Sequence, residues 1–350
     1  MDRSHSMIRP IPVLPAAVGD LLRTAAGARG AVAVLSAATL CAAPLPVFAQ
    51  TAGPSRIVRI IVPSPPGGPS DYAARLVAQR LPEALGQPVI VDNRPGGNSV
   101  PGLEFAIRQP ADGNTLAIAT VGVLAVLPHL QKMPFDTLRD LTPVANLIGG
   151  PSYLLVHPSV PVKSVRDLIA LARKRPGELT FASASLGQIS HMNGELMKVL
   201  AGIDMLHVPY KGTALVLPAL IGGEVSMTFS TSSDALQFVK SGRLRLLAVT
   251  GRQRLAMMPE VPTMAESGLP GFESLNWNGI VAPAGMPREL LLRLNREIVR
   301  AISGADIRDR VGAQGNFVIG DSPEEFAAYI RAEHAKWGDV VKRANIRLET

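Results

Sequence analysis

The chain has 350 residues, a formal net charge of +7 and one cysteine. This length is typical of about two domains, and a single cysteine, Cys41, excludes a disulfide framework and a cysteine-ligated metal site. The basic residues are dispersed and only two tryptophans are present, which argues against a nucleic-acid partner.

The beginning of the chain differs in composition from the rest. Four arginines accompany an alanine-rich apolar stretch at residues 31–48, which ends in Val-Phe-Ala at 47–49. Pro44 and Pro46 cut this stretch below the ~20 apolar residues that a membrane span needs. We therefore predict a secretory signal peptide over residues 1–49, cleaved after its last alanine, and a mature chain in the periplasm.

The first strand–turn–helix unit of the mature chain is the most informative segment. A β-branched run at 57–62 predicts a buried strand, and a proline- and glycine-rich turn ends it. Ser70 is a candidate N-cap and Asp71 suits the first turn of the helix that follows. Such a turn offers main-chain N–H groups to an anion, although in the alternative Gly67-Gly68 only shapes the turn. Because neither a Walker nor a GxGxxG sequence is present, we expect a carboxylate rather than a phosphate.

The same unit of apolar strand, small-residue turn and helix recurs along the chain. The expected strands lie at 88–93, 115–120, 141–148, 152–158, 179–185, 205–210, 225–231 and 244–250. The expected helices begin near Ser99, Ser164, Ser190, Thr213, Ser232, Pro287 and Ser322. This alternation is typical of an α/β protein with doubly wound, mainly parallel sheets. We expect one lobe from 50–153 with 276–350, and a second lobe from 154–275.

Four turns at the carboxyl ends of expected strands form the candidate ligand site, because ligands bind there in open α/β sheets. These turns supply hydroxyls, small side chains and N–H groups, but no nucleophile beside a base. We therefore expect no catalytic residue, no metal and no cofactor. The candidate ligand-binding residues are Gly67, Gly68, Ser70, Asp71, Thr120, Val121, Gly122, Val123, Ser183, Ser185, Gly187, Ser190, His191, Ser230 and Thr231.

Four motifs carry a resemblance to a known family. They are VPSPPGGPSD (62–71), LGQPVIVDNRPGG (85–97), HVPYKGTA (207–214) and APAGMP (282–287). With them the chain resembles the Bug-type extracytoplasmic solute receptors, the substrate-binding subunits of tripartite tricarboxylate transporters. The resemblance implies a two-lobed, type II-like periplasmic binding fold that closes on a small organic carboxylate in the interlobe cleft. It also implies transporter subunits in the membrane as partners and no catalysis; we expect a monomer.

The resemblance further implies that main-chain groups and waters hold the carboxylate near the first strand–helix turn and the 183–191 turn. Two positions depart from the pattern expected of the family. Val123-Leu124 stands where polar residues are expected, and Ser230-Thr231 stands where an acid or amide is expected. Because an unpaired second carboxylate buried beside Val123 and Leu124 would cost several kcal/mol, we predict that an aromatic or aliphatic monocarboxylate binds better than citrate, malate or aspartate.

Two alternative functions remain open at the level of sequence. A secreted α/β hydrolase or isomerase would use His191 or Asp71 as a base. However, a lone histidine more often only hydrogen-bonds locally, and the helix dipole alone accounts for an aspartate in a first turn. A receptor with the same fold that reports its ligand to a membrane kinase is the second alternative.

Overall fold

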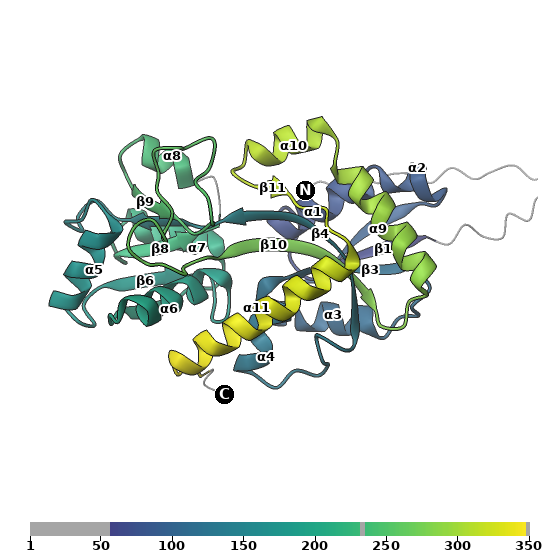
Figure 1. Cartoon of the computed structure of the whole chain (residues 1–350), viewed down its shortest axis with the longest axis horizontal. Coiled ribbons are helices and arrows are strands. Elements are labelled where there is room, and N and C mark those ends of the chain that lie inside the picture. The colour runs from purple at the N-terminus through teal and green to yellow at the C-terminus, as the bar shows by residue number, and fades with distance from the viewer. Residues whose placement is uncertain (1–56, 232–234, 348–350) are drawn as a thin grey trace, which may run out of the picture. The chain divides into compact units, whose positions relative to one another are not determined.

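The structure is a computed structural model that describes residues 57–231 and 235–347, and these described residues belong to one compact unit. The predicted signal peptide and the predicted helix cap at 232–234 lie outside the described residues. Two β-sheets with flanking helices make up the unit (Figure 1). Within the described ranges, no helix has the length and apolarity needed to cross a membrane.

The first sheet has six strands in the order β11-β4-β10-β3-β1-β2. Their bounds are Val58–Val62 for β1, Val89–Asn93 for β2, Thr115–Thr120 for β3, Leu141–Pro151 for β4, Leu275–Pro283 for β10 and Phe317–Val318 for β11. β1 pairs in parallel with β2 and β3, whereas β10 is antiparallel to both β3 and β4, and β11 is antiparallel to β4.

The second sheet has five strands in the order β7-β6-β8-β5-β9. Their bounds are Tyr153–Val156 for β5, Thr180–Ser183 for β6, Leu206–Pro209 for β7, Met227–Ser230 for β8 and Arg245–Val249 for β9. β6 pairs in parallel with β7 and β8, and β5 is antiparallel to β8 and β9.

The α/β fold with two sheets is confirmed, but both sheets are mixed rather than mainly parallel. The reason lies where the chain passes between the sheets. β4 runs out of the first sheet directly into β5 of the second, and β10 returns between β3 and β4 in the opposite direction. Local strand–helix alternation carries no information on this long-range pairing. The two-lobe division at 153/154 and 275/276 stays a prediction.

Thirteen helical segments are described. Beside the first sheet they are α1 (Pro69–Ala78), α2 (Leu81–Leu85), η1 (Gly97–Ser99), α3 (Val100–Ile107), η2 (Gly122–Val126), α4 (Leu127–Leu130), α9 (Arg288–Ile302), α10 (Ala305–Gly312) and α11 (Pro323–Arg343). Beside the second sheet they are α5 (Val165–Lys174), α6 (Ile189–Ala201), α7 (Thr213–Ile221) and α8 (Ala235–Lys240).

Two of the predicted helix caps are confirmed and two are wrong. Ser164 caps α5, and Ser322 forms a complete capping box with Glu325 at α11. Ser70 and Ser190, however, lie inside the first turns of α1 and α6, whose N-caps are residues 68 and 188. Pro69 explains the first shift, because proline is well suited to the first helical position and so starts the helix two residues earlier.

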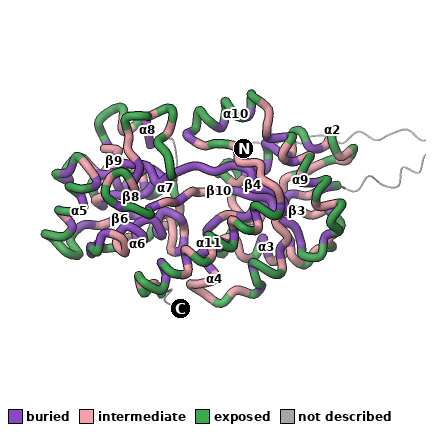
Figure 2. The backbone as a smooth tube through the Cα atoms, in the orientation of Figure 1, coloured by how far each residue is buried: buried purple, intermediate pink, exposed green. Residues whose placement is uncertain are grey.

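The core lies along the inner strands of both sheets, which are buried over most of their length, whereas the edge strands β2, β7 and β11 contain no buried residue (Figure 2). Trp277 of β10 is completely buried and meets Phe326 of α11 edge-on, with 5.4 Å between the ring centroids. α11 therefore packs directly on the central strands of the first sheet. A large aromatic pair of this kind buries a substantial apolar area and fixes the helix on the sheet.

Candidate functional site

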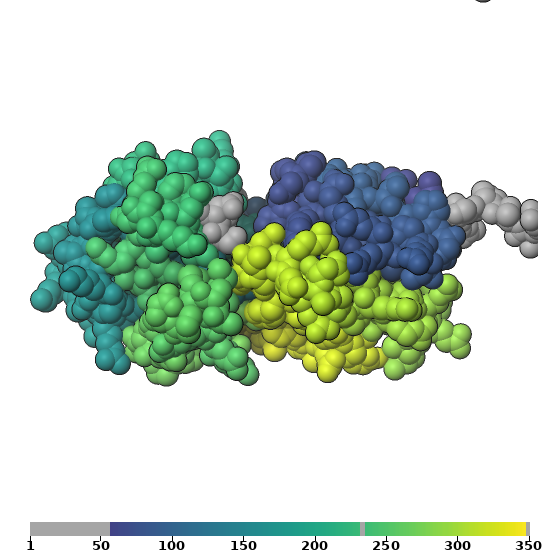
Figure 3. Space-filling model, turned by 90° about the horizontal axis from the view of Figure 1, so that it is seen from above, coloured from purple at the N-terminus to yellow at the C-terminus, as the bar shows by residue number. Residues whose placement is uncertain are grey.

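One predicted ligand turn of the first sheet, after β3, meets one of the second sheet, after β6. A Cβ atom placed on Gly122, after β3, would lie 3.6 Å from the carbonyl oxygen of Gly187, after β6. The hydroxyl of Ser185 donates to Oδ1 of Asn98 at 3.5 Å, again from one sheet to the other. In Figure 3 a crevice separates the teal-to-green residues of the second sheet from the purple-blue residues of the first. The structure thus brings together turns that are far apart in the sequence.

The first turn, between β1 and α1, depends on Gly67 and Asp71. Gly67 has a φ of +83°, a conformation that favours glycine, and its N–H donates to Oδ2 of Asp71 at 3.0 Å. Gly68, the N-cap, has a φ of −81°, which any residue can adopt. The conformational need for glycine therefore lies at Gly67.

Asp71 is a structural anchor. Its buried carboxylate pairs with Nε of Arg75 at 2.8 Å and accepts from Nδ2 of Asn93 at 3.0 Å, in addition to the N–H of Gly67. The hydrogen bond from Arg75 is the main reason why the pKa of Asp71 falls to about 2. A carboxylate so fully bonded and so weakly basic is a poor general base, which argues against the enzymatic alternative at this residue.

Ser70 links the turn to the middle of the sheet. Its hydroxyl donates to Oδ1 of Asn278 at 2.6 Å, and Asn278 lies on β10 directly opposite Thr120 of β3. Thus Thr120, the last residue of its strand, lies next to the first turn in space. Asn278 has no counterpart among the sequence predictions, because nothing local marks an asparagine 208 residues away as a partner.

Residues 96–99, between β2 and α3, form a second feature that sequence reasoning missed. Four successive residues have positive φ values: Gly96 at 121°, Gly97 at 49°, Asn98 at 51° and Ser99 at 73°. Ser99 is held there by its hydroxyl, which donates to the carbonyl of Pro63 at 3.0 Å. The sequence signal for this feature is an asparagine after two glycines, because asparagine tolerates positive φ values better than most residues.

The second turn, between β6 and α6, repeats the design of the first. Gly187 has a φ of +75°, and its N–H donates to Nδ1 of His191 at 3.2 Å. The hydroxyl of Ser190 accepts the N–H of Ala184 at 3.2 Å. A side chain at Gly187 would also press on Leu127 and Leu130 of α4, at 3.0 Å from each.

His191 is neutral and buried. Its ring stacks on that of His207 with 4.0 Å between centroids, and Nε2 of His207 lies 2.6 Å from the hydroxyl of Ser183. Burial lowers the pKa of His191 to about 3 and that of His207 to about 4. Since Nδ1 of His191 accepts an N–H, the ring proton is on Nε2 and no lone pair is left for a base. The geometry gives no support to catalysis by His191.

The apolar segment after β3 does not present its side chains to the crevice. Val121 is 1% exposed, Val123 2% and Leu124 0%, and all three lie in the main hydrophobic core. The argument that Val123 and Leu124 form an apolar wall for the ligand therefore fails for their side chains. Ser230 is buried at the end of β8 and Thr231 is half-buried after it. A ligand role for these residues stays a prediction.

The first turns of α1 and α6 are suited to binding an anion through main-chain groups, and this role stays a prediction. The first turns of α1 and α6 leave N–H groups without partners inside their helices, and the helix dipoles favour a negative charge there. Among the described residues no cluster of histidine, cysteine or carboxylate side chains could hold a metal. Two cavities, of about 500 and 430 Å³, are lined by other residues, namely 128–139 with His334 and 251–257 with 312–317.

Comparison with known proteins decides the family. The family model described as "Tripartite tricarboxylate transporter family receptor" matches residues 73–346. The chain belongs to this family of receptors. Membership confirms the predicted resemblance and the prediction that the chain works by binding rather than by catalysis.

Similar receptors are known from several bacteria. Protein BugT of Bordetella pertussis is 35% identical over 306 residues, which are 87% of this receptor and 94% of BugT. A solved structure from R. palustris with adipate is 36% identical, with a TM-score of 0.75 over 84% of this chain and 99% of that one. MatC from Rhodopseudomonas palustris, solved with bound malate, is 30% identical, with a TM-score of 0.72 over 83% and 100%.

Proposed function

We propose that this receptor captures a small organic carboxylate in the periplasm and delivers it to a tripartite tricarboxylate-type transporter in the membrane. The observation that carries the proposal is the meeting of loops from the two sheets, at Gly122 with Gly187 and at Asn98 with Ser185. Family membership supports it, as do the relatives solved with adipate and malate.

The ligand class that fits best is an aliphatic dicarboxylate. Two helix N-termini, those of α1 and α6, can each hold one carboxylate at the two ends of a flexible chain. The burial of Val123 and Leu124 removes the physical basis for preferring a monocarboxylate. Adipate, the acid in the solved structure of one relative, is such a molecule, with two carboxylates on an apolar chain, and that relative is 36% identical to this receptor.

Titration calorimetry with adipate and hexanoate tests this proposal. The two acids have the same chain length and differ in one carboxylate. We expect adipate to bind at least tenfold more tightly, because hydrogen bonds to a charged group contribute about 1.5–3 kcal/mol. Malate, citrate, aspartate and benzoate complete the panel.

The outcomes distinguish the capture of a small carboxylate from the preference for a dicarboxylate. If hexanoate or benzoate binds as tightly as adipate, the dicarboxylate class is wrong and the monocarboxylate prediction returns. If none of these acids binds while the chain is folded, capture of a small carboxylate is itself in doubt.

A further inference from the structure

The chain passes between the two sheets at two places that lie side by side. Ser152 stands between β4 of the first sheet and β5 of the second. Thr250 directly follows β9 of the second sheet, and Ser274 directly precedes β10 of the first. All three residues are at most 1% exposed.

Main-chain hydrogen bonds tie these three residues into a short ladder, with Thr250 in the middle. The N–H of Thr250 donates to the carbonyl of Ser152 at 3.0 Å, and the N–H of Ser274 donates to the carbonyl of Thr250 at 2.9 Å. These bonds alone leave the N–H of Ser152 and the carbonyl of Ser274 to be satisfied.

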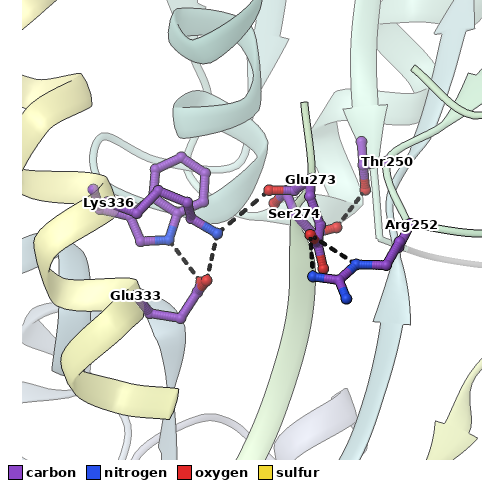
Figure 4. A network of polar contacts seen from close by, with 7 residues as sticks. Thr250, Arg252, Glu273, Ser274, Glu333 and Lys336 are labelled. Carbon is purple, nitrogen blue, oxygen red and sulfur yellow. Dashed lines mark hydrogen bonds and ion pairs between the residues drawn. The ribbon is translucent and has the colours of Figure 1, made fainter. Parts of the chain in front are cut away.

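The hydroxyl of Thr250 satisfies both remaining groups. Oγ1 accepts the N–H of Ser152 at 2.8 Å and donates to the carbonyl of Ser274 at 2.7 Å. Figure 4 shows the second of these bonds, beside Glu273 and Arg252. One hydroxyl therefore binds both crossing segments, as an acceptor for Ser152 and as a donor to Ser274.

The same point is also tied to α11. Nζ of Lys336 donates to the carbonyl of Glu273, the residue before Ser274, at 3.3 Å. The buried carboxylate of Glu333 holds Lys336 in place and accepts Nε1 of Trp337 at 2.9 Å (Figure 4). α11 is thus fixed to the segment that Thr250 holds.

Ser152 and Ser274 connect this ladder to the two ligand turns, the first through a hydrogen bond and the second through strand β10. The hydroxyl of Ser152 accepts from Nδ2 of Asn193 at 3.1 Å, and Asn193 lies on α6, the helix that follows the second turn. On the other side Ser274 leads into β10, where Asn278 accepts the hydroxyl of Ser70 in the first turn.

We propose that Thr250 is a positioning residue whose hydroxyl fixes the orientation of the second sheet relative to the first, and thereby the distance between the two ligand turns. It touches neither turn. The 430 Å³ cavity, lined by Pro151, Gly251, Glu273 and Leu275, lies beside the crossing segments and gives them room to move apart once the hydroxyl is lost.

Thr250→Val is the variant that tests this role, because valine keeps the shape of threonine and removes the hydroxyl. Thr250→Ser restores the hydroxyl and is the rescue. Thr228→Val is the matched control: Thr228 is 0% exposed like Thr250, but its hydroxyl donates to the carbonyl of Ala182 within the second sheet at 2.9 Å.

The main readout is the distance distribution between two spin labels, measured by pulsed electron resonance without ligand. The labels are placed at Lys174→Cys on α5 and Arg293→Cys on α9, both exposed, in a Cys41→Ser background that has no other cysteine. We expect Thr250→Val to broaden the distribution, and Thr250→Ser and Thr228→Val to leave it as in the parent chain. Thermal unfolding of each variant shows that it is folded.

A second readout uses adipate and rests on the proposed function. If Thr250→Val leaves about a tenth of the molecules with both turns in place, adipate affinity falls roughly tenfold, while Thr228→Val leaves it unchanged. Unchanged label distances in folded Thr250→Val overturn the positioning role, as does equal broadening by Thr228→Val or a failure of Thr250→Ser to rescue. If adipate binds to no variant, only the ligand class fails, and the label distances still decide the role of Thr250.

Discussion

At the scale of single residues, the two ligand turns are built alike. In each, a glycine with positive φ donates its N–H to a side chain four residues later, Gly67 to Asp71 and Gly187 to His191. One acceptor is a charged carboxylate and the other is a neutral imidazole. Asp71 and His191, which the sequence offered as candidate bases, therefore hold the backbone of their turns in place.

The neutral state of His191 makes stability dependent on pH. The pKa values of His191 and His207 are about 3 and about 4 in the folded chain, below the ordinary 6.5. Between these folded pKa values and 6.5, the unfolded chain binds more protons than the folded chain does. The stabilisation that the two neutral histidines provide is therefore present above pH 6.5 and is lost as the pH falls. We expect the two histidines together to lower the free energy of unfolding by about 2–4 kcal/mol between pH 6.5 and 5. Asp321 offsets part of this drop, because burial raises the pKa of its carboxyl to about 6 and so makes it stabilise the fold as the pH falls.

His191→Asn separates this effect from the titration of other groups. The amide oxygen can still accept the N–H of Gly187, but the side chain no longer titrates. Urea unfolding at both pH values should show a drop that is about 1–2 kcal/mol smaller in this variant than in the wild type, the share of one histidine. The same drop in both proteins would show that His191 is not kept neutral by burial.

At the scale of elements, each strand–turn–helix unit could be predicted from its own residues, but the use of its polar groups could not. The β-branched run before Pro63 and the serine before Val165 are sufficient to place β1 and α5. Ser70 and Ser190 also look like caps by sequence, yet their hydroxyls bond to Asn278 and to the N–H of Ala184. These partners are set by tertiary packing, on which local preference has no bearing.

The two adjacent glycines of the first turn provide a test at this scale. Gly67→Ala should destabilise the chain by about 1–2 kcal/mol, because alanine is strained at a φ of +83° even though no atom lies within 4 Å of its Cβ. Gly68→Ala should change stability little, since its φ of −81° is ordinary and its Cβ would lie 3.7 Å from the carbonyl of Pro65. The loss of an N-cap glycine and the gain from a stiffer unfolded chain are of similar size there.

Thermal unfolding of the two alanine variants decides between these positions. A larger loss of stability for Gly68→Ala than for Gly67→Ala would contradict the backbone geometry of the turn.

At the scale of the whole molecule, the pairing of β10 with both β3 and β4 is the feature that sequence could not supply. β3 and β4 were expected from their own residues, but neither β10 nor β11 was among the expected strands. The lobe boundaries near Tyr153 and Asn276 stay a prediction. The mixed pairing depends on contacts between residues more than a hundred positions apart, such as Thr120 with Asn278. The same pairing sets Asn278 beside Ser70 and so completes the site.

A ligand held by turns of both sheets should draw them together, and this closure is the last prediction. A ligand shifts a conformational equilibrium only by its differential affinity for the two states, and a dicarboxylate that spans both turns has such a difference. At an adipate concentration of 100 times Kd, the bound state gains about 2.7 kcal/mol, so amides near Tyr153 and Asn276 that exchange through opening should exchange roughly 100-fold more slowly.

Hydrogen exchange and small-angle scattering measure this closure together. Adipate should protect both crossing segments and reduce the radius of gyration, whereas hexanoate at the same concentration, with one carboxylate for two turns, should do neither. Because exchange reports on local opening and scattering on the distance between the sheets, agreement of the two excludes simple local rigidification. Saturating adipate that leaves both measurements unchanged would show that the turns bind the acid without bringing the sheets together.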